Sequence, residues 1–186
     1  MTQIKQYAAA IVEEISGLTN SLPDDVAEAL ADAILEAGHI FVAGAGRSGL
    51  MGKAFAMRLM HMGFEAYVVG ETVTKGFGQG DVLVLGSGSG KTESLIAMAG
   101  KATALGGTVA VVTTDPNSIL GQSAAITVKL SASPKDASDT ARATIQPMAS
   151  LFEQGLLIFY DAVILRLMEK KGLDSGTMYG SHANLE

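Results

Sequence analysis

Short apolar segments alternate with segments of helical periodicity through the middle of the chain. Five apolar runs are typical of strands, namely residues 39–43, 66–69, 81–85, 108–113 and 125–130. Helical patterns lie between several of them, at residues 50–62, 92–105 and 119–123. Strands that are apolar throughout and are joined by helices form parallel sheets with helices on both faces. The alternation therefore predicts an α/β fold with a doubly wound sheet of five parallel strands.

Further helices are expected on both sides of this sheet. Residues 1–20 have helical spacing, and a second helix should begin at Leu22–Asp25 and run to Leu35. After a polar loop at residues 131–143, a long helix is expected from about Ile145 to Lys170, followed by a polar tail from Gly172. Since no linker or internal repeat interrupts the pattern, we expect one domain that spans residues 1–186.

The composition excludes several classes of function. A net charge of −6 over 186 residues argues against nucleic acid as a partner. An anionic small molecule remains compatible with it, because such a ligand needs only a local positive field. The absence of Cys excludes disulfides, thiolate metal ligands and a Cys nucleophile, and it fits a reducing cytoplasm. The most apolar stretch, Met148–Met168, contains Glu153, Asp161 and Arg166, so we predict a buried helix and no membrane span.

The first glycine-rich turn is Gly44–Gly49, with the sequence GAGRSG. It matches the GxGxxG pattern of dinucleotide-binding folds, and Glu71 lies at a suitable distance downstream. Arg47 and Ser48 occupy the two variable positions. A cation and a hydroxyl there suit the binding of a phosphate group better than the uncharged turn that lies beside the pyrophosphate in a dinucleotide-binding fold. An NAD-binding protein therefore stays as an alternative, with a simple phosphate site preferred.

The second glycine-rich turn spans Gly86–Thr92, with the sequence GSGSGKT. A nucleotide P-loop would need Gly at position 85, which is Leu85. The turn instead offers the hydroxyls of Ser87, Ser89 and Thr92 beside three glycines that let the backbone approach a ligand. Because both turns follow strands and precede helices, they form candidate anion sites at the carboxyl edge of the sheet. We prefer a phosphate-binding loop to a turn that merely caps a helix.

Several stretches together resemble one enzyme family. They are GAGRSGLMGKAFAMRLMHMGF, GSGSGKTESL, SPKDAS, IQPMASLFEQ and the final HANLE. The chain resembles, over nearly its whole length, the 6-phospho-3-hexuloisomerase family of the sugar isomerase (SIS) domain superfamily. Lys91 departs from the pattern, since relatives often carry Glu there. The resemblance implies a flavodoxin-like sheet, a homotetramer, and no metal or other cofactor.

The same resemblance implies an activity. Members interconvert D-arabino-3-hexulose 6-phosphate and D-fructose 6-phosphate in the second step of formaldehyde fixation by the ribulose monophosphate pathway. The partners implied are therefore the sugar phosphate, other copies of the chain, and a functionally coupled 3-hexulose-6-phosphate synthase. Two alternatives remain: a sugar-phosphate sensor without turnover, and another SIS-type aldose-ketose phosphate isomerase.

The chemistry needs a base that removes a carbon-bound proton. Glu153 lies in an apolar stretch where an isolated carboxylate is costly, so the residues alone favour a base and a structural carboxylate equally. The resemblance favours the base, and it makes His182 a candidate for proton transfer, with His61 as its rival. The expected phosphate-binding residues are Arg47, Ser48, Ser87, Gly88, Ser89 and Thr92. A salt bridge to a nearby acid is the alternative for Arg47.

The long helix at 145–170 is apolar nearly all round, which is more than one sheet face requires. We therefore expect a homo-oligomer in which the tail delivers His182 into a neighbouring subunit's pocket. Asp161 is expected to form a structural pair, for example with Arg166. Gly155 is expected to permit close helix packing. The scattered histidines have no acidic partners close in sequence, which makes a metal site unexpected.

Overall fold

The computed structural model describes residues 2–132 and 144–185 and is built on one parallel sheet. The strands are β1 (Ile40–Gly44), β2 (Ala66–Val68), β3 (Val82–Gly86), β4 (Thr108–Thr113) and β5 (Ile126–Lys129). Their order is β2-β1-β3-β4-β5, and every neighbouring pair is parallel. The predicted flavodoxin-like sheet of five parallel strands is confirmed.

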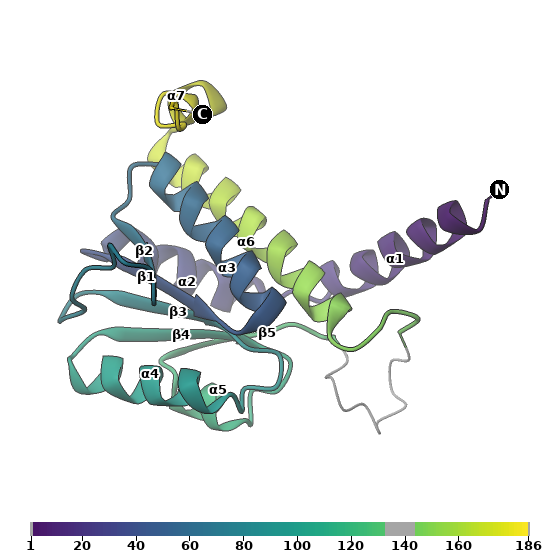
Figure 1. Cartoon of the computed structure of the whole chain (residues 1–186), viewed down its shortest axis with the longest axis horizontal. Helices are drawn as coiled ribbons and strands as arrows, with labels where there is room; N and C mark the ends of the chain where they lie inside the picture. Colours follow the sequence, from purple (N-terminus) through teal and green to yellow (C-terminus); the bar gives the residue numbers. More distant parts are fainter. Residues whose placement is uncertain (1, 133–143, 186) are drawn as a thin grey trace.

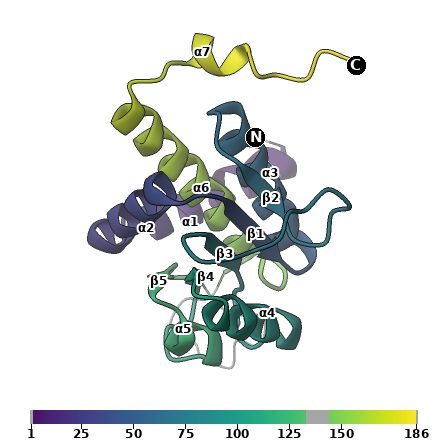
Figure 2. The same ribbon diagram turned by 90° about the vertical axis from the view of Figure 1, so that its left-hand side faces the viewer.

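Helices cover both faces of the sheet, as predicted (Figures 1 and 2). One face packs against α2 (Asp24–Glu36), α3 (Gly46–His61), α6 (Ser150–Lys171) and the end of α1 (Gln3–Thr19). The other face packs against α4 (Glu93–Ala104) and α5 (Ile119–Ser123). Alternate residues of the strands feed the two cores, as the twofold repeat of a strand requires: Val84 belongs to the first core and Leu83 and Leu85 to the second.

Two helix starts differ from the predicted ones. α3 begins at Gly46, four residues before the predicted Leu50, because Gly46 adopts a positive φ of 57° that turns the chain directly into the helix. α6 begins at Ser150 instead of Ile145. Residues 144–146 are bound by the Glu14 carboxylate of α1, which holds them outside the helix.

The tail contains a short helix, α7 (Ser175–Tyr179), that the polar sequence did not predict. Asp174 caps it, since its carboxylate accepts a hydrogen bond of 2.7 Å from the Thr177 N–H. The predicted loop at 131–143 lies outside the described residues from position 133 onward, and so does the SPKDAS stretch through Ser138.

Contacts of α6 confirm one sequence prediction and correct another. Gly155 lies against Leu18 of α1, where a Cβ at position 155 would approach the Leu18 Cδ1 to 2.6 Å, so glycine lets the Leu18 side chain pack closely on α6. Arg166 does not pair with Asp161. It pairs with Glu28 of α2 at 2.5 Å and with Glu169 at 2.7 Å, since the three-residue spacing to Glu169 suits a helix better than the five-residue spacing to Asp161.

Candidate active site

A small cavity lies at the carboxyl ends of β1 and β3, which are neighbours in the sheet. This is the point at which the strand order reverses, where open α/β sheets bind their ligands. The cavity volume is about 80 Å³. Whole small-molecule sites measure roughly 300–1,000 Å³, so this cavity suits one group of a ligand and is too small for a dinucleotide.

Three helices begin at this cavity. Ser48 lies in the first turn of α3, Thr92 is the residue before α4, and Ala149 and Phe152 lie at the start of α6, and all four line the cavity. The amino-terminal end of a helix carries a partial positive charge and free N–H groups. Three such ends at one cavity make a positive site in a protein whose net charge is −6.

The first glycine turn supplies Ser48 and permits a close backbone approach. A Cβ on Gly49 would lie 2.5 Å from the Gly44 carbonyl oxygen, so α3 packs on β1 only with glycine at this position. Glu71, the acid that would complete a dinucleotide fingerprint, lies beyond the end of β2 and pairs with Lys53 of α3 at 2.5 Å. This pairing weakens the dinucleotide alternative.

The second glycine turn supplies most of the polar cavity wall. Ser87, Gly88, Ser89 and Thr92 all line it, and the Ser87 and Thr92 hydroxyl oxygens are 3.5 Å apart. Thr92 occupies the N-cap position of α4, but its side chain makes no capping bond. Capping by the Thr92 side chain, part of the alternative in which the turn merely caps a helix, is therefore wrong, and the hydroxyl remains available to a ligand.

Two threonines hold this loop: Thr113, the last residue of β4, and Thr114, which follows it. No pattern in the sequence predicted either contact. The Gly88 carbonyl accepts hydrogen bonds from the Thr113 hydroxyl at 3.1 Å and from the Thr114 hydroxyl at 2.8 Å. It also accepts one from the Thr114 N–H at 3.1 Å. Since the C=O and N–H of a trans peptide point in opposite directions, this anchoring directs the Ser89 N–H away from β4. Thr114 also lines the cavity.

Glu153 lies in the first turn of α6, is 7% exposed and forms an ion pair with Arg47. The Arg47 Nη1 is 2.9 Å from the Glu153 Oε2 and also donates to the Ser150 hydroxyl at 3.0 Å. The salt bridge named as the alternative for Arg47 is therefore present. It leaves other guanidinium donors free, because arginine has five and its side chain is 56% exposed. A buried carboxylate beside a cation provides a proton acceptor next to a stabilising positive charge.

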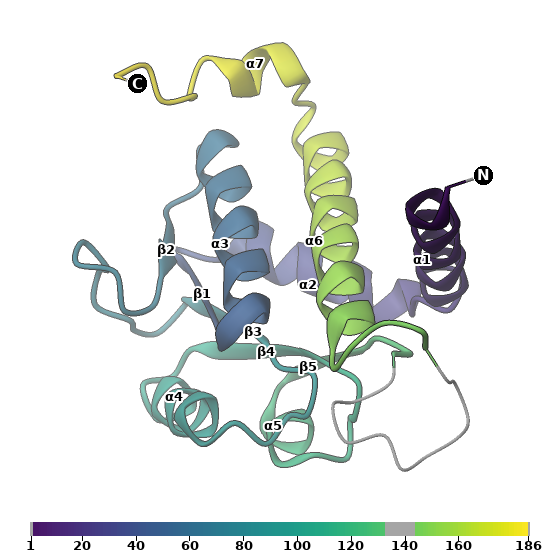
Figure 3. The ribbon, with the colours of Figure 1, turned by 45° about the vertical axis from the view of Figure 1, so that its right-hand side comes forward.

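His182 lies far from Glu153 in the same chain. Its ring stacks on His61 at the other end of α3, with the ring centroids 5.5 Å apart, and on Tyr179 of α7 at 6.0 Å. Ser48 and His61 are separated by 13 residues of one helix, or roughly 20 Å at 1.5 Å per residue. Figure 3 shows α7 beyond this distant end of α3 and α6. One chain thus does not bring its own His182 to its own cavity.

His61 is buried, with 6% of its surface exposed. Burial lowers its pKa, and the electrostatic effect of the nearby Arg58 and His182 side chains lowers it further. A cavity of about 400 Å³ between α3, α6 and α7 is lined by both histidines and by Asp161. In the described parts of the chain, no three His, Asp or Glu side chains are grouped so that they could hold a metal ion.

Comparison with known proteins identifies the class to which this fold and cavity belong. The SIS domain model matches residues 33–159, which include both glycine turns and Glu153. The chain belongs to the SIS domain family.

The most informative relatives within this family share a name. The chain is 55% identical to the 3-hexulose-6-phosphate isomerase of Bacillus subtilis, over 97% of this chain and 98% of the relative. It is 33% identical to the enzyme of the same name from Methylomonas aminofaciens, over 98% and 100% of the two chains. A crystal structure from Methanococcus jannaschii, for which the function of a 3-hexulose-6-phosphate isomerase was inferred, is 33% identical with a TM-score of 0.84 over 97% and 99%. These matches confirm the resemblance seen in the sequence.

Proposed function

We propose that the chain interconverts D-arabino-3-hexulose 6-phosphate and D-fructose 6-phosphate. The proposal rests on a phosphate-sized cavity that is lined by the starts of α3 and α6, with the buried Glu153 of α6 paired to the more exposed Arg47 of α3 at the same two helix starts. The 55% identity to an enzyme of this name over nearly the full length of both chains supports the substrate.

The phosphate group would occupy the cavity. Its negative charge would meet three helix ends, the hydroxyls of Ser48, Ser87, Ser89 and Thr92, and the backbone of Gly88. Arg47 lies beside the same wall and is free to contribute a further donor. Binding the phosphate at one end places the reacting carbons at a defined distance from Glu153.

The reaction moves a carbonyl from C3 to C2 without an external oxidant or reductant. Glu153 would remove the proton from C2, and the electron pair of the C2–H bond would form a C2–C3 double bond as the C3 carbonyl becomes an enediolate oxygen. Arg47 would stabilise this negative charge. The C2 hydroxyl proton would move to the C3 oxygen, and Glu153 would return its proton to C3, which leaves a carbonyl at C2.

We further propose that His182 carries the proton between the two oxygens from a neighbouring copy. Large apolar side chains remain exposed along α1, α3 and α6: Ile4, Tyr7, Val12, Leu50, Met57, Met60, Ile158 and Leu165. On α3 this surface runs from the cavity end to the His61–His182 end. In a twofold assembly each patch meets its counterpart, so packing two copies in opposite directions along α3 would bring one copy's histidines to the other's cavity. A homotetramer, and coupling to a 3-hexulose-6-phosphate synthase in the formaldehyde fixation route, complete the proposal.

We also propose that residues 1–186 form one catalytic domain that works in the cytoplasm. In the described residues no helix combines the length and apolar character needed to cross a bilayer.

The experiment is to supply the purified chain with the 3-hexulose phosphate in EDTA and to measure fructose 6-phosphate formation by a coupled assay. We expect turnover without added metal or nucleotide. Binding without turnover would favour a sensor instead. Conversion only of an aldose-ketose phosphate pair would favour another SIS-type isomerase.

A further inference from the structure

The connection from β2 to β3 lacks the helix that the other strand connections have. α3, α4 and α5 join the remaining consecutive strands, whereas residues 69–81 between β2 and β3 contain no helix. The helices α4 and α5 lie below one half of the sheet in Figure 2, and the other half of that face is left to this loop. An apolar sheet surface without its covering helix requires another cover.

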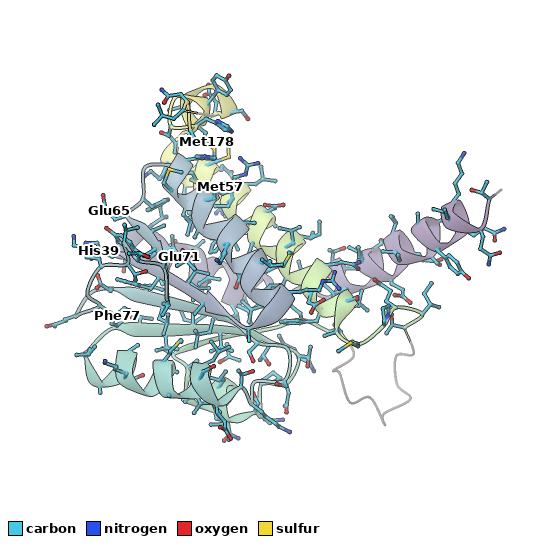
Figure 4. All side chains as sticks on the ribbon, in the orientation of Figure 1. His39, Met57, Glu65, Glu71, Phe77 and Met178 are labelled. Carbon is cyan, nitrogen blue, oxygen red and sulfur yellow. The ribbon has the colours of Figure 1, made fainter. Side chains whose placement is uncertain are left out.

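Phe77 anchors the loop on this surface. Its ring meets the Phe41 ring edge-on, with the centroids 5.1 Å apart. It also lies so close to Gly107 that a Cβ there would come within 2.3 Å of the ring. Figure 4 shows Phe77 and His39 at the same end of the sheet. The anchor covers only part of the exposed face.

A cavity of about 390 Å³ remains beside Phe77. This volume lies within the range of roughly 300–1,000 Å³ of small-molecule sites. Its wall is mostly apolar and comes from the sheet, the loop and α4: Phe41, Val69, Phe77, Leu83, Met98 and Leu105. The cavity is separate from the phosphate site, because the two share no lining residue.

Two lysines give this apolar cavity a positive rim. Lys101 lines it from the last turn of α4 and has no carboxylate partner within residues 2–132 and 144–185. Lys75 lines it from the loop, and its Nζ is 2.9 Å from the His39 Nε2, which is not a carboxylate. The Asp81 carboxylate is hydrogen-bonded to the other nitrogen of the His39 ring, with 2.8 Å between the Asp81 Oδ1 and the His39 Nδ1.

The other acids near this loop already have partners. Glu71 pairs with Lys53 at 2.5 Å, and Glu65 accepts a hydrogen bond from the Tyr67 hydroxyl at 2.6 Å. Neither of these acids lines the cavity, whose described lining contains two lysines and no carboxylate, although the protein as a whole carries a net charge of −6.

We propose that this cavity is a second ligand site, which takes a small amphipathic anion. The ligand would place an aromatic ring or a short acyl chain against Phe41 and Phe77 and its carboxylate or sulfonate between Lys75 and Lys101. Apolar contact supplies affinity, and the two cations select the charge and orientation of the ligand. The inference uses no residue of the phosphate site and does not depend on the isomerase activity.

The probe is 1-anilinonaphthalene-8-sulfonate, which combines a fused aromatic ring with one negative charge. Its fluorescence should saturate at one site per chain. The Lys101→Gln variant should weaken binding about fivefold, as expected for one partly solvated charge worth about 1 kcal/mol. Removing both lysines should weaken it further, and raising the salt concentration should reduce the difference between variants.

Three controls separate this site from others. Lys129→Gln removes an exposed lysine of β5, at the far edge of the sheet, and should leave binding unchanged. Ala102→Phe should fill the cavity and abolish binding while the variant remains folded by circular dichroism. Fructose 6-phosphate should not displace the probe. The proposal would be overturned if the double lysine variant and a folded Ala102→Phe chain both bound the probe as tightly as the unchanged protein. Displacement of the probe by fructose 6-phosphate would also overturn it.

Discussion

At the residue scale, the serine hydroxyls of the second glycine turn are the groups whose role is most open to a direct test. Ser87 is 4% exposed and lines the cavity, with its hydroxyl facing Thr92. A phosphate in the cavity would give this buried hydroxyl a strong hydrogen-bond partner. Glu153 lies on α6 and pairs with Arg47 of α3, so the proposed base is a different residue from the hydroxyls proposed to bind the phosphate.

We predict that Ser87→Ala and Ser89→Ala each weaken fructose 6-phosphate binding by about 1.5–3 kcal/mol, the usual value of a hydrogen bond to a charged group. Isothermal titration calorimetry measures this loss. Ser94→Ala is the matched control, because Ser94 is exposed on α4 and does not line the cavity. Fructose without phosphate should bind poorly to the unchanged protein. Tight NADH binding in place of fructose 6-phosphate would revive the dinucleotide alternative.

At the element scale, the start of α6 depends on α1. The Glu14 carboxylate of α1 accepts hydrogen bonds from the Thr144 hydroxyl at 2.6 Å, the Ile145 N–H at 2.8 Å and the Gln146 side chain at 2.8 Å. Burial alone would raise the pKa of Glu14, but these hydrogen bonds outweigh it and lower the pKa below 4.5. The contact places the segment from which α6 and Glu153 follow.

We predict that Glu14→Gln lowers the free energy of unfolding by about 1 kcal/mol at pH 7, since the hydrogen bonds are partly exposed to solvent. A carboxylate whose pKa is lowered by folding stabilises the protein above its unfolded pKa and loses this effect as the pH falls through the folded value. The difference between the two proteins should therefore shrink as the pH falls below 4.5, the ordinary glutamate value. Urea unfolding at several pH values measures it.

Glu13→Gln is the matched control for this prediction. Glu13 is exposed on the same helix, and no hydrogen bond of its side chain is found among the described residues. A difference between Glu14→Gln and the unchanged protein that stays constant from pH 7 to pH 3 would contradict the assigned role.

The elements that the sequence predicted best are those decided by local patterns. Residues 108–113 and 119–123 form β4 and α5 with the predicted bounds, because a continuous apolar run and the adjacent turn residues decide them locally. The starts of α3 and α6 were misplaced by four and five residues, since a positive φ and a contact with α1 decide them.

The same difference between local and distant contacts decides which parts of the site could be predicted. The glycine turns and Glu153 lie in short sequence motifs, so they could be found in the sequence. The roles of Thr113 and Thr114 depend on Gly88, which is 25 residues or more away in the chain, and the Arg47–Glu153 ion pair joins residues still further apart. No local pattern predicts contacts of this kind.

At the scale of the whole molecule, the proposed proton transfer by His182 requires active sites built by two chains. The cavity holds only one group of a substrate, and His182 lies at the other end of α3. The projecting α1 in Figure 1 and the exposed apolar side chains of α3 and α6 offer surface for such an assembly.

We predict that Glu153→Gln and His182→Ala chains, each inactive alone, recover part of the activity when they are unfolded and reassembled together. Some sites then receive Glu153 from one chain and His182 from the other. As a control, Glu153→Gln mixed with Ser87→Ala should show no activity beyond that of the Ser87→Ala chains alone, because both residues lie in the same chain's part of the site. Mixed oligomers that stay inactive in the first pairing would mean that one chain builds each site or that His182 takes no part.

Solvent exchange at the C2 carbon of the hexulose phosphate tests the central claim most directly. Glu153→Gln retains the size of the side chain but removes the proton acceptor. In deuterium oxide the unchanged protein should exchange the C2 hydrogen, as followed by NMR. A folded Glu153→Gln chain that still binds fructose 6-phosphate should show no exchange. Undiminished exchange in that chain would contradict Glu153 as the base.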